Sequence, residues 1–194
     1  ASGEIEAAPL LLLDVATSEG VTGSAYLFGY VPATLKPLLA LVDELRPELL
    51  GQAVAPVERM AQMQARFRLL GLQGLLGMLA STLDMAYWDA LGKAAGQPVV
   101  RLLGGQAKAV RAYDSYGLVD PAQDAAALRA SLDKGFKGIK IKLGHADARR
   151  DERIAREVRE LIGPDVALMV DYNQSLSPAE AVRRVRSLAS VDLH

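Results

Sequence analysis

The second half of the chain alternates between strand-like and helix-like segments, and this alternation limits the fold more than any other feature of the sequence. Short apolar runs favour strands, and longer stretches bounded by capping residues favour helices. The expected strands are Arg111–Ser115, Gly138–Leu143 and Val166–Val170, with another beginning at Val191–Leu193. The expected helices run from Asp120-Pro121 to Gly135, over Asp147–Ile162 and onward from Ser177-Pro178. Lys140 and Asp171 stand about 30 residues apart, the length of one βαβ unit, so we expect parallel neighbouring strands joined by right-handed crossovers.

Three such units do not complete a domain. A barrel of eight units takes roughly 250 residues, and three strands alone would leave apolar faces and edges uncovered. We therefore expect this chain to be part of a longer one. The alternative is a small open α/β sheet that is completed by a few more residues or by a partner.

The residues before Gly104 follow a different order, with strands first and helices afterwards. Leu10–Val15 and Thr22–Phe28 flank the turn residues Ser18-Glu19-Gly20, which predicts an antiparallel hairpin. Helices are expected over Pro32–Leu50, after Pro56 and over Leu72–Ala95, with Pro47 marking an end or kink in the first and Gly96 available to stop the last. The change of order predicts an α+β domain over residues 1–105 and a second domain over residues 106–194.

Composition narrows the classes of partner. Twenty-two Lys and Arg against 23 Asp and Glu give a net charge of -1, so no basic field attracts nucleic acid or an anionic membrane. The uncharged stretch Leu69–Leu83 is too short to cross a bilayer and is interrupted by glycines. The chain contains no cysteine, and its N-terminus lacks the plan of a signal peptide. We expect no nucleic-acid partner, no membrane partner and a cytoplasmic location.

Two lysines alternate with apolar residues in the expected strand Gly138–Leu143. Side chains of a strand point to alternating faces, so Lys140 and Lys142 share one face and Ile139 and Ile141 share the other. Two amines on an enclosed face disfavour each other's positive charge, which suits one of them to act as a general base. The alternative is an exposed edge strand whose lysines are solvated.

Asp171 ends the next strand, at the edge where parallel sheets usually place their active sites. A carboxylate there is a candidate ligand for a hard cation such as Mg²⁺, although one aspartate cannot hold the ion alone. The alternatives are a helix cap for Asp171 and a turn residue for Asn173, which lies two positions further on.

A lysine pair beside a metal-binding carboxylate is suited to removing a proton α to a carboxylate group, because cations stabilise the enolate while an amine takes the proton. Phosphoryl transfer lacks support, since the sequence has no glycine-rich loop that ends in Gly-Lys-Ser/Thr. The only histidines are His145 and His194, which makes a Ser-His-Asp hydrolase a poor fit.

Several motifs resemble the mandelate racemase/muconate lactonizing enzyme family of the enolase superfamily. Asp84–Pro98, followed by Arg101–Gly105, resembles the family's join between its capping domain and its barrel. Lys140-Ile-Lys142 resembles the paired-lysine motif of the second barrel strand, and Asp171–Ser175 resembles the end of the third. The resemblance implies an α+β capping domain, whose start is missing, before a (β/α)8 TIM-type barrel of which the first three βα units are present. Ala1–Ala8 is similar to the middle of the family's capping flap.

The resemblance also implies roles for individual residues. Lys142 would be the base that exchanges the α-proton on one face of the substrate, and Lys140 would lie beside the substrate carboxylate. Asp171 would be the first Mg²⁺ ligand. Ser115 and Asn173 match positions that contact the substrate carboxylate and α-hydroxyl, and Tyr30 matches a position where the capping domain closes over the site. Tyr113-Asp-Ser115 together with Asp171–Ser175 resembles the mandelate-racemizing members in particular.

The resemblance places two further metal-binding glutamates, a His-Asp pair and a late glutamate beyond His194, so the 194 residues alone are expected to be inactive. We expect an Mg²⁺-dependent racemase that acts on a 2-hydroxy carboxylate such as mandelate, in a homo-oligomer that is often an octamer. One alternative is an acid-sugar dehydratase or another isomerase of the same superfamily. A non-enzyme alternative is a non-catalytic module with solvated lysines.

Overall fold

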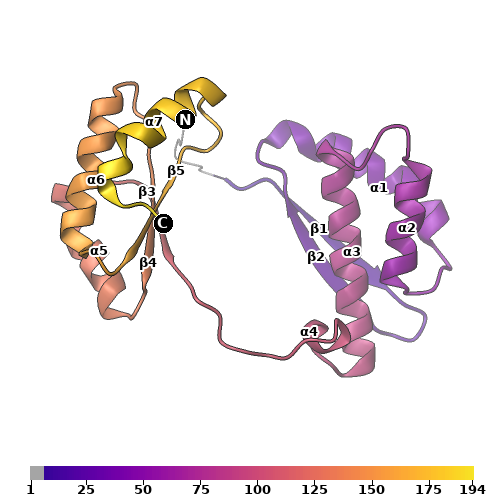
Figure 1. Cartoon of the computed structure of the whole chain (residues 1–194). Coiled ribbons are helices and arrows are strands. Elements are labelled where there is room, and N and C mark those ends of the chain that lie inside the picture. Colours follow the sequence, from indigo (N-terminus) through magenta and orange to yellow (C-terminus); the bar gives the residue numbers. More distant parts are fainter. Residues whose placement is uncertain (1–6) are drawn as a thin grey trace. The chain divides into compact units, whose positions relative to one another are not determined.

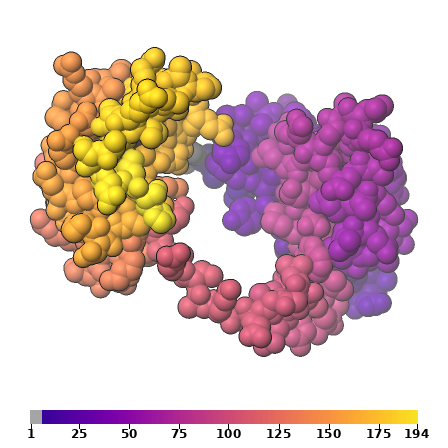
Figure 2. All heavy atoms as spheres, in the orientation of Figure 1, coloured from indigo at the N-terminus to yellow at the C-terminus, as the bar shows by residue number. Residues whose placement is uncertain are grey.

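The computed structural model describes residues 7–194, which form two units (Figure 1). One unit ends at Lys108, and the other extends from Ala109 to His194. Figure 2 draws the heavy atoms of both units, coloured from indigo to magenta in the first and from salmon to yellow in the second. The resemblance of Ala1–Ala8 to a capping flap falls almost wholly on residues outside the described range.

The N-terminal unit consists of an antiparallel hairpin with helices packed against it. Its elements are β1 (Leu10–Ala16), β2 (Thr22–Phe28), η1 (Pro32–Thr34), α1 (Leu35–Leu49), α2 (Pro56–Arg66), α3 (Gly74–Ala95) and α4 (Val99–Leu102). The predicted hairpin is confirmed, with Leu13 opposite Ala25. α1 continues two residues beyond Pro47, and Gly96 ends α3 in the left-handed conformation at φ 61°.

Helix α3 lies directly on β2, and one glycine permits the close approach. A Cβ atom on Gly23 would stand 2.0 Å from the carbonyl oxygen of Ala86. The unit is closed by apolar side chains from the hairpin and from the three long helices, including Leu27, Leu38 and Leu79. The N-terminal unit is therefore an α+β domain with a core of its own.

The C-terminal unit consists of three strand–helix repeats. Its elements are β3 (Asp114–Leu118), α5 (Pro121–Asp133), β4 (Gly138–Lys142), α6 (Ala148–Ile162), β5 (Ala167–Asp171), α7 (Pro178–Ser187) and η2 (Ala189–Val191). The strands pair in the order β3-β4-β5 and all run parallel, as predicted. The expected capping residues Asp120 and Ser177 accept hydrogen bonds at the first turns of α5 and α7.

The central strand β4 separates a structural face from a polar face. Ile139 and Ile141 are fully buried, and they pack with Leu128 of α5 and Val158 of α6 in one apolar core. Figure 1 shows α5 and α6 along the same side of this sheet. Lys140 and Lys142 alternate with the isoleucines and are only partly buried. The predicted alternation is confirmed, and the polar face is the one that can carry chemistry.

Two strand predictions need correction. β3 begins at Asp114 rather than Arg111, because β4 starts at Gly138 and offers no backbone partner to residues 111–112; its first pair is Asp114 with Ile139. The strand expected at Val191–Leu193 is not formed within the described residues. Residues 189–191 form a short 3-10 helix, and Asp192 adopts a left-handed conformation at φ 55°. The backbone N–H of His194 nevertheless donates to the carbonyl of Leu168 in β5 at 2.9 Å.

Candidate active site

The strand register places most of the predicted site residues in two rows on the polar face of the sheet. Ser115, Lys140 and Met169 pair across β3, β4 and β5, and the next row holds Leu118, Lys142 and Asp171. Paired residues of parallel strands point to the same face. Lys142 and Asp171 are therefore neighbours at the carboxyl ends of their strands, which is where parallel α/β folds usually carry their active sites.

Lys140 contacts the side chain of Asp171, at the end of β5, and that of Tyr113, just before β3. Its Nζ lies 3.8 Å from Oδ2 of Asp171, with side-chain exposures of 25% and 34%. The same ammonium donates to the hydroxyl of Tyr113 at 3.4 Å, and it lies 5.1 Å from the centre of the Tyr113 ring, within cation–π range. Tyr113 was not predicted as a site residue, although it stands two residues before Ser115 and belongs to the motif Tyr113-Asp-Ser115 that carries part of the family resemblance.

The conformation of Asp171 leaves one carboxylate oxygen directed at the site. Oδ1 accepts from the backbone N–H of Asn173 at 2.8 Å, while Oδ2 faces Lys140. Asn173 and Gln174 both have positive φ, at 48° and 57°, so the chain turns sharply after β5. The side chain that caps α7 belongs to Ser177, which does not support the interpretation of Asp171 as a helix cap.

Asp171 fits one position of a magnesium site. Mg²⁺ prefers oxygen ligands and commonly keeps several positions for water and substrate. Asp171 supplies a partly exposed carboxylate with unused lone pairs at the sheet edge. Between residues 7 and 194, no group of three or more His, Cys, Asp or Glu side chains is placed to hold a metal ion. Asp171 is therefore a candidate for one ligand position, and the described residues place no three-membered set of such groups around it.

Tyr172 follows Asp171 and belongs to the buried side of the turn. Its hydroxyl is buried, and it has no hydrogen-bond partner within residues 7–194. Burial raises the pKa of Tyr172 to about 12, and the nearby negative charge of Asp151 acts in the same direction. The phenol stays protonated at neutral pH, so Tyr172 is unsuited to act as a general base.

The remaining predicted residues differ in their placement. Ser115 and Asn173 are exposed at the site. Tyr30 belongs to the N-terminal unit, where it has an unusual φ of 63° and its ring lies 4.8 Å from that of Phe28. It is 72% exposed, and its part in the site stays a prediction. The C-terminal unit contains the other five predicted residues, at or near one end of its sheet: Ser115, Lys140, Lys142, Asp171 and Asn173.

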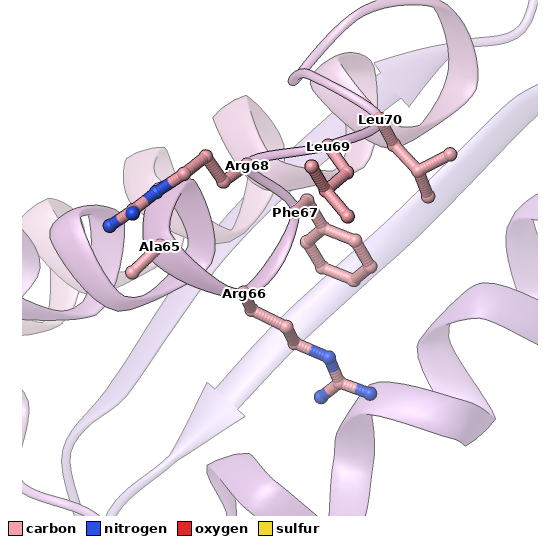
Figure 3. A pocket seen from close by; sticks show the side chains of 6 residues that line it. All are labelled: Ala65, Arg66, Phe67, Arg68, Leu69 and Leu70. Carbon is pink, nitrogen blue, oxygen red and sulfur yellow. The ribbon is translucent and has the colours of Figure 1, made fainter.

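Two hollows lie in the N-terminal unit. One, of about 700 Å³, is lined by the turn residues Ala65–Leu70, where the guanidinium of Arg66 lies 5.1 Å from the Phe67 ring centre (Figure 3). No carboxylate, histidine or lysine lines it. The other, of about 850 Å³, lies between β1, α1 and α3, and most of its lining is apolar. The second hollow also has Asp14, Glu19 and Arg46 in its lining, but no lysine. No helix within residues 7–194 is long and apolar enough to cross a membrane.

Comparison with protein families matches both parts of the chain. Residues 1–104 match the family described as mandelate racemase / muconate lactonizing enzyme, N-terminal domain. Residues 123–194 match the family described as enolase C-terminal domain-like. Together with the parallel sheet, these matches confirm the predicted fold class of a capping domain followed by part of a TIM-type barrel.

Solved and curated proteins give the same fold with several activities. An enolase from Bradyrhizobium, crystallised with magnesium and mandelic acid, is 55% identical, with a TM-score of 0.92 over 97% of this chain and 53% of that chain. Arabinonate dehydratase of Saccharolobus solfataricus is 31% identical over 95% of this chain and 50% of its own length. D-galactarolactone cycloisomerase of Agrobacterium fabrum is 34% identical over 89% and 46%. The chain thus spans about half the length of the curated relatives that it matches.

Proposed function

Because the chain belongs to the mandelate racemase/muconate lactonizing enzyme family of the enolase superfamily, we propose that it forms part of an Mg²⁺-dependent enzyme that removes the α-proton of a 2-hydroxy carboxylate. The observation that carries the proposal is the grouping of Lys142, Lys140 and Asp171 on the polar face of one parallel sheet. The preferred reaction is racemisation of a mandelate-like acid.

In the proposed reaction, the uncharged amine of Lys142 accepts the α-proton. The C–H bond breaks, and its electron pair moves into the adjacent carboxylate group to give an enediolate. The ammonium of Lys140 lies beside the developing negative charge and stabilises it. When it is bound at Asp171, Mg²⁺ supplies further stabilisation of that charge. Racemisation is completed when a proton returns to the opposite face of the α-carbon.

Ser115 and Asn173 are proposed to bind the substrate. Both are exposed, and the row that contains Ser115 also contains Lys140. A hydroxyl and an amide can donate hydrogen bonds to a carboxylate and to an α-hydroxyl group. Tyr30, which matches a position where the family's capping domain closes over the site, is also proposed as a substrate-binding residue. The bound mandelic acid in the Bradyrhizobium enolase, at 55% identity, supports an aromatic 2-hydroxy acid.

Dehydration of an acid sugar is the second candidate function, and the similarity to arabinonate dehydratase favours it. The first step is the same. The electron pair of the enediolate then expels the hydroxyl of the neighbouring carbon, which leaves as water after it takes a proton, and the resulting enol becomes a 2-keto acid. The two functions therefore differ in the product rather than in the proton-abstraction step.

The decisive experiment follows the α-hydrogen in heavy water. The full-length protein is incubated with Mg²⁺ and each enantiomer of mandelate in D₂O, and the α-hydrogen signal is followed by NMR. Racemisation predicts loss of that signal and appearance of the other enantiomer. Dehydration predicts no reaction with mandelate and release of a 2-keto acid from arabinonate. A protein that does neither would contradict the proposed reaction and favour the non-catalytic module.

A variant pair assigns the base. Lys142→Met should stop exchange of the enantiomer whose α-hydrogen faces Lys142, whereas Lys137→Met should not, because Lys137 is exposed just before β4. Equal exchange by both variants would contradict the role proposed for Lys142.

The homo-oligomer also stays a prediction. The molar mass of the full-length protein in solution, measured by light scattering, would test it.

A further inference from the structure

A buried carboxylate holds the loop that follows the proposed base. Asp151 lies in the first turn of α6 and is 1% exposed. Its Oδ1 accepts from the backbone N–H of His145 at 3.1 Å and contacts the ring Nδ1 of His145 at 2.7 Å. Its Oδ2 accepts from the backbone N–H of Gly144 at 3.1 Å. One side chain therefore binds two consecutive backbone groups of the β4–α6 loop.

Arg184 of α7 completes the arrangement from the other side. It is 6% exposed, and its Nη1 donates to Oδ2 of Asp151 at 2.5 Å. Its Nη2 donates to the carbonyl oxygen of His145 at 3.1 Å, and its Nε donates to Oε1 of Glu180 at 2.8 Å. The same loop residue is thus held through its N–H by Asp151 and through its carbonyl by Arg184.

These bonds begin next to Lys142. The backbone N–H of Leu143 donates to the carbonyl oxygen of Asp171 at 3.1 Å, and the Leu143 side chain is buried in the core. Gly144 follows at φ 134°, a conformation that side-chain-bearing residues rarely adopt. All three backbone N–H groups after Lys142 are therefore bound, and the path of the chain leaves little freedom to its Cα position.

Stability alone is a weak explanation for this pair. Burying two charges forfeits their hydration, and well-packed apolar side chains often stabilise a fold as well or better. The distinctive property of Asp151 and Arg184 is that they bind the backbone of one loop as well as each other. Outer residues that orient catalytic groups typically change activity by about 10–100-fold when they are removed, as seen around metal ligands.

We propose that Asp151 and Arg184 are positioning residues. By clamping the backbone of Gly144 and His145, they fix the position of the Lys142 Cα atom, and with it the reach of the amine towards the substrate. The inference rests on the proposed function, in which Lys142 is the base. Proton transfer depends steeply on the distance between donor and acceptor, and a displacement of about 1 Å can lower a rate about 100-fold. The pair acts through the loop and does not contact the substrate.

The test compares two arginines whose side chains both bind backbone carbonyls. Arg159 of α6 is the matched control, because it binds the carbonyls of Gly163 and Val166, near the amino end of β5 and at the opposite edge of the sheet from Lys142. Arg184→Met and Arg159→Met are made in the full-length protein. Deuterium exchange into mandelate gives kcat and KM, and thermal unfolding gives the stability of each variant.

Arg184→Met should lower kcat by about 10–100-fold with little change in KM, whereas Arg159→Met should leave kcat nearly unchanged at a similar loss of stability. Arg184→Lys, which keeps the charge but not the planar set of donors, should recover part of the loss and provides the measurement if Arg184→Met does not fold. Equal effects of the Arg184 and Arg159 variants on kcat, or an unchanged kcat in the Arg184 variants, would overturn the inference.

A second readout does not depend on activity. The rate at which acetic anhydride modifies the Lys142 amine, measured by mass spectrometry at one pH, reports the surroundings of that amine. It should change several-fold in Arg184→Lys or Arg184→Met and not in Arg159→Met. If the wild-type protein exchanges no α-hydrogen, the proposed function fails, and this labelling rate still decides whether the clamp controls Lys142. An identical rate in all variants would overturn the clamp.

Discussion

The ammonium of Lys140 lies 3.8 Å from Oδ2 of Asp171 on the adjacent parallel strand. Each side chain therefore lowers the electrostatic penalty of placing the other at a partly buried sheet edge. Asp171 also accepts a backbone hydrogen bond through its second oxygen, Oδ1, so its orientation is set before any ligand binds. The pair supplies a preformed charge arrangement rather than one that a substrate must assemble.

Removal of the Asp171 charge should weaken magnesium binding. Asp171→Asn keeps the size of the side chain but loses its negative charge, so we expect Mg²⁺ affinity of the full-length protein to fall by about tenfold or more. Isothermal titration with MgCl₂ measures the change. Asp165→Asn is the matched control, because Asp165 is exposed in the turn before β5. Equal affinities of the two variants would contradict the ligand role of Asp171.

The ring and hydroxyl of Tyr113 should contribute differently to the site. At 3.4 Å the hydrogen bond from Lys140 is long, so Tyr113→Phe should lower the exchange rate only a few-fold while it keeps the cation–π contact. Tyr113→Leu removes both interactions and should lower the rate further, because it raises the activation free energy by about 1 kcal/mol. The rate of α-deuterium exchange checks the order. A larger loss in the Phe variant than in the Leu variant would contradict it.

Loss of the Arg159 guanidinium should destabilise the C-terminal unit. The guanidinium donates to four backbone carbonyls, those of Gly163, Val166, Val191 and Asp192. Arg159→Met leaves these acceptors without their partner and should lower the free energy of unfolding by about 2–4 kcal/mol. Urea unfolding gives the value.

Arg156→Met provides the comparison on the same helix. Arg156 forms an exposed pair with Glu152, one turn away, and such a pair contributes less than about 1 kcal/mol. If Arg159→Met were no more destabilising than Arg156→Met, the four carbonyl contacts would not stabilise the unit as expected.

Glu180 gives the C-terminal unit a defined response to acid. Hydrogen bonds from Arg184, and then from Arg183, hold the pKa of Glu180 below its usual value of 4.5. A lowered folded-state pKa contributes stability that is present above the unfolded-state pKa and is lost as the pH falls through the folded-state pKa. The difference in Tm between the wild type and Glu180→Gln should therefore be constant near neutral pH and shrink below about pH 4.5. A difference that grows on acidification would contradict this assignment.

Features encoded within one element were predictable from the sequence. The alternation of Lys140 and Lys142 with isoleucines needs only the period of a strand, and the caps at Asp120 and Ser177 need only the residues around them. The proximity of Lys140 and Asp171 followed from the expectation that their strands are parallel neighbours.

Features that depend on contacts between distant elements were not predictable. Tyr113 lies just before β3, outside the regular strand, so strand alternation does not report its contact with Lys140, and β3 itself has an irregular register between Ser115 and Leu118. Asp151 and Arg184 lie on different helices, and no local pattern connects them. Arg159 binds carbonyls from the turn after its own helix and from η2, a segment expected to begin a strand.

The two faces of β4 have a consequence for how this protein can diversify. Ile139 and Ile141 hold the core, whereas Lys140 and Lys142 serve the opposite face. A substitution at either lysine leaves the apolar packing intact, so selection can alter reactivity without lowering the stability of the fold. Adjacent positions of the strand thereby serve reactivity and stability separately, and relatives with unlike substrates can keep one scaffold.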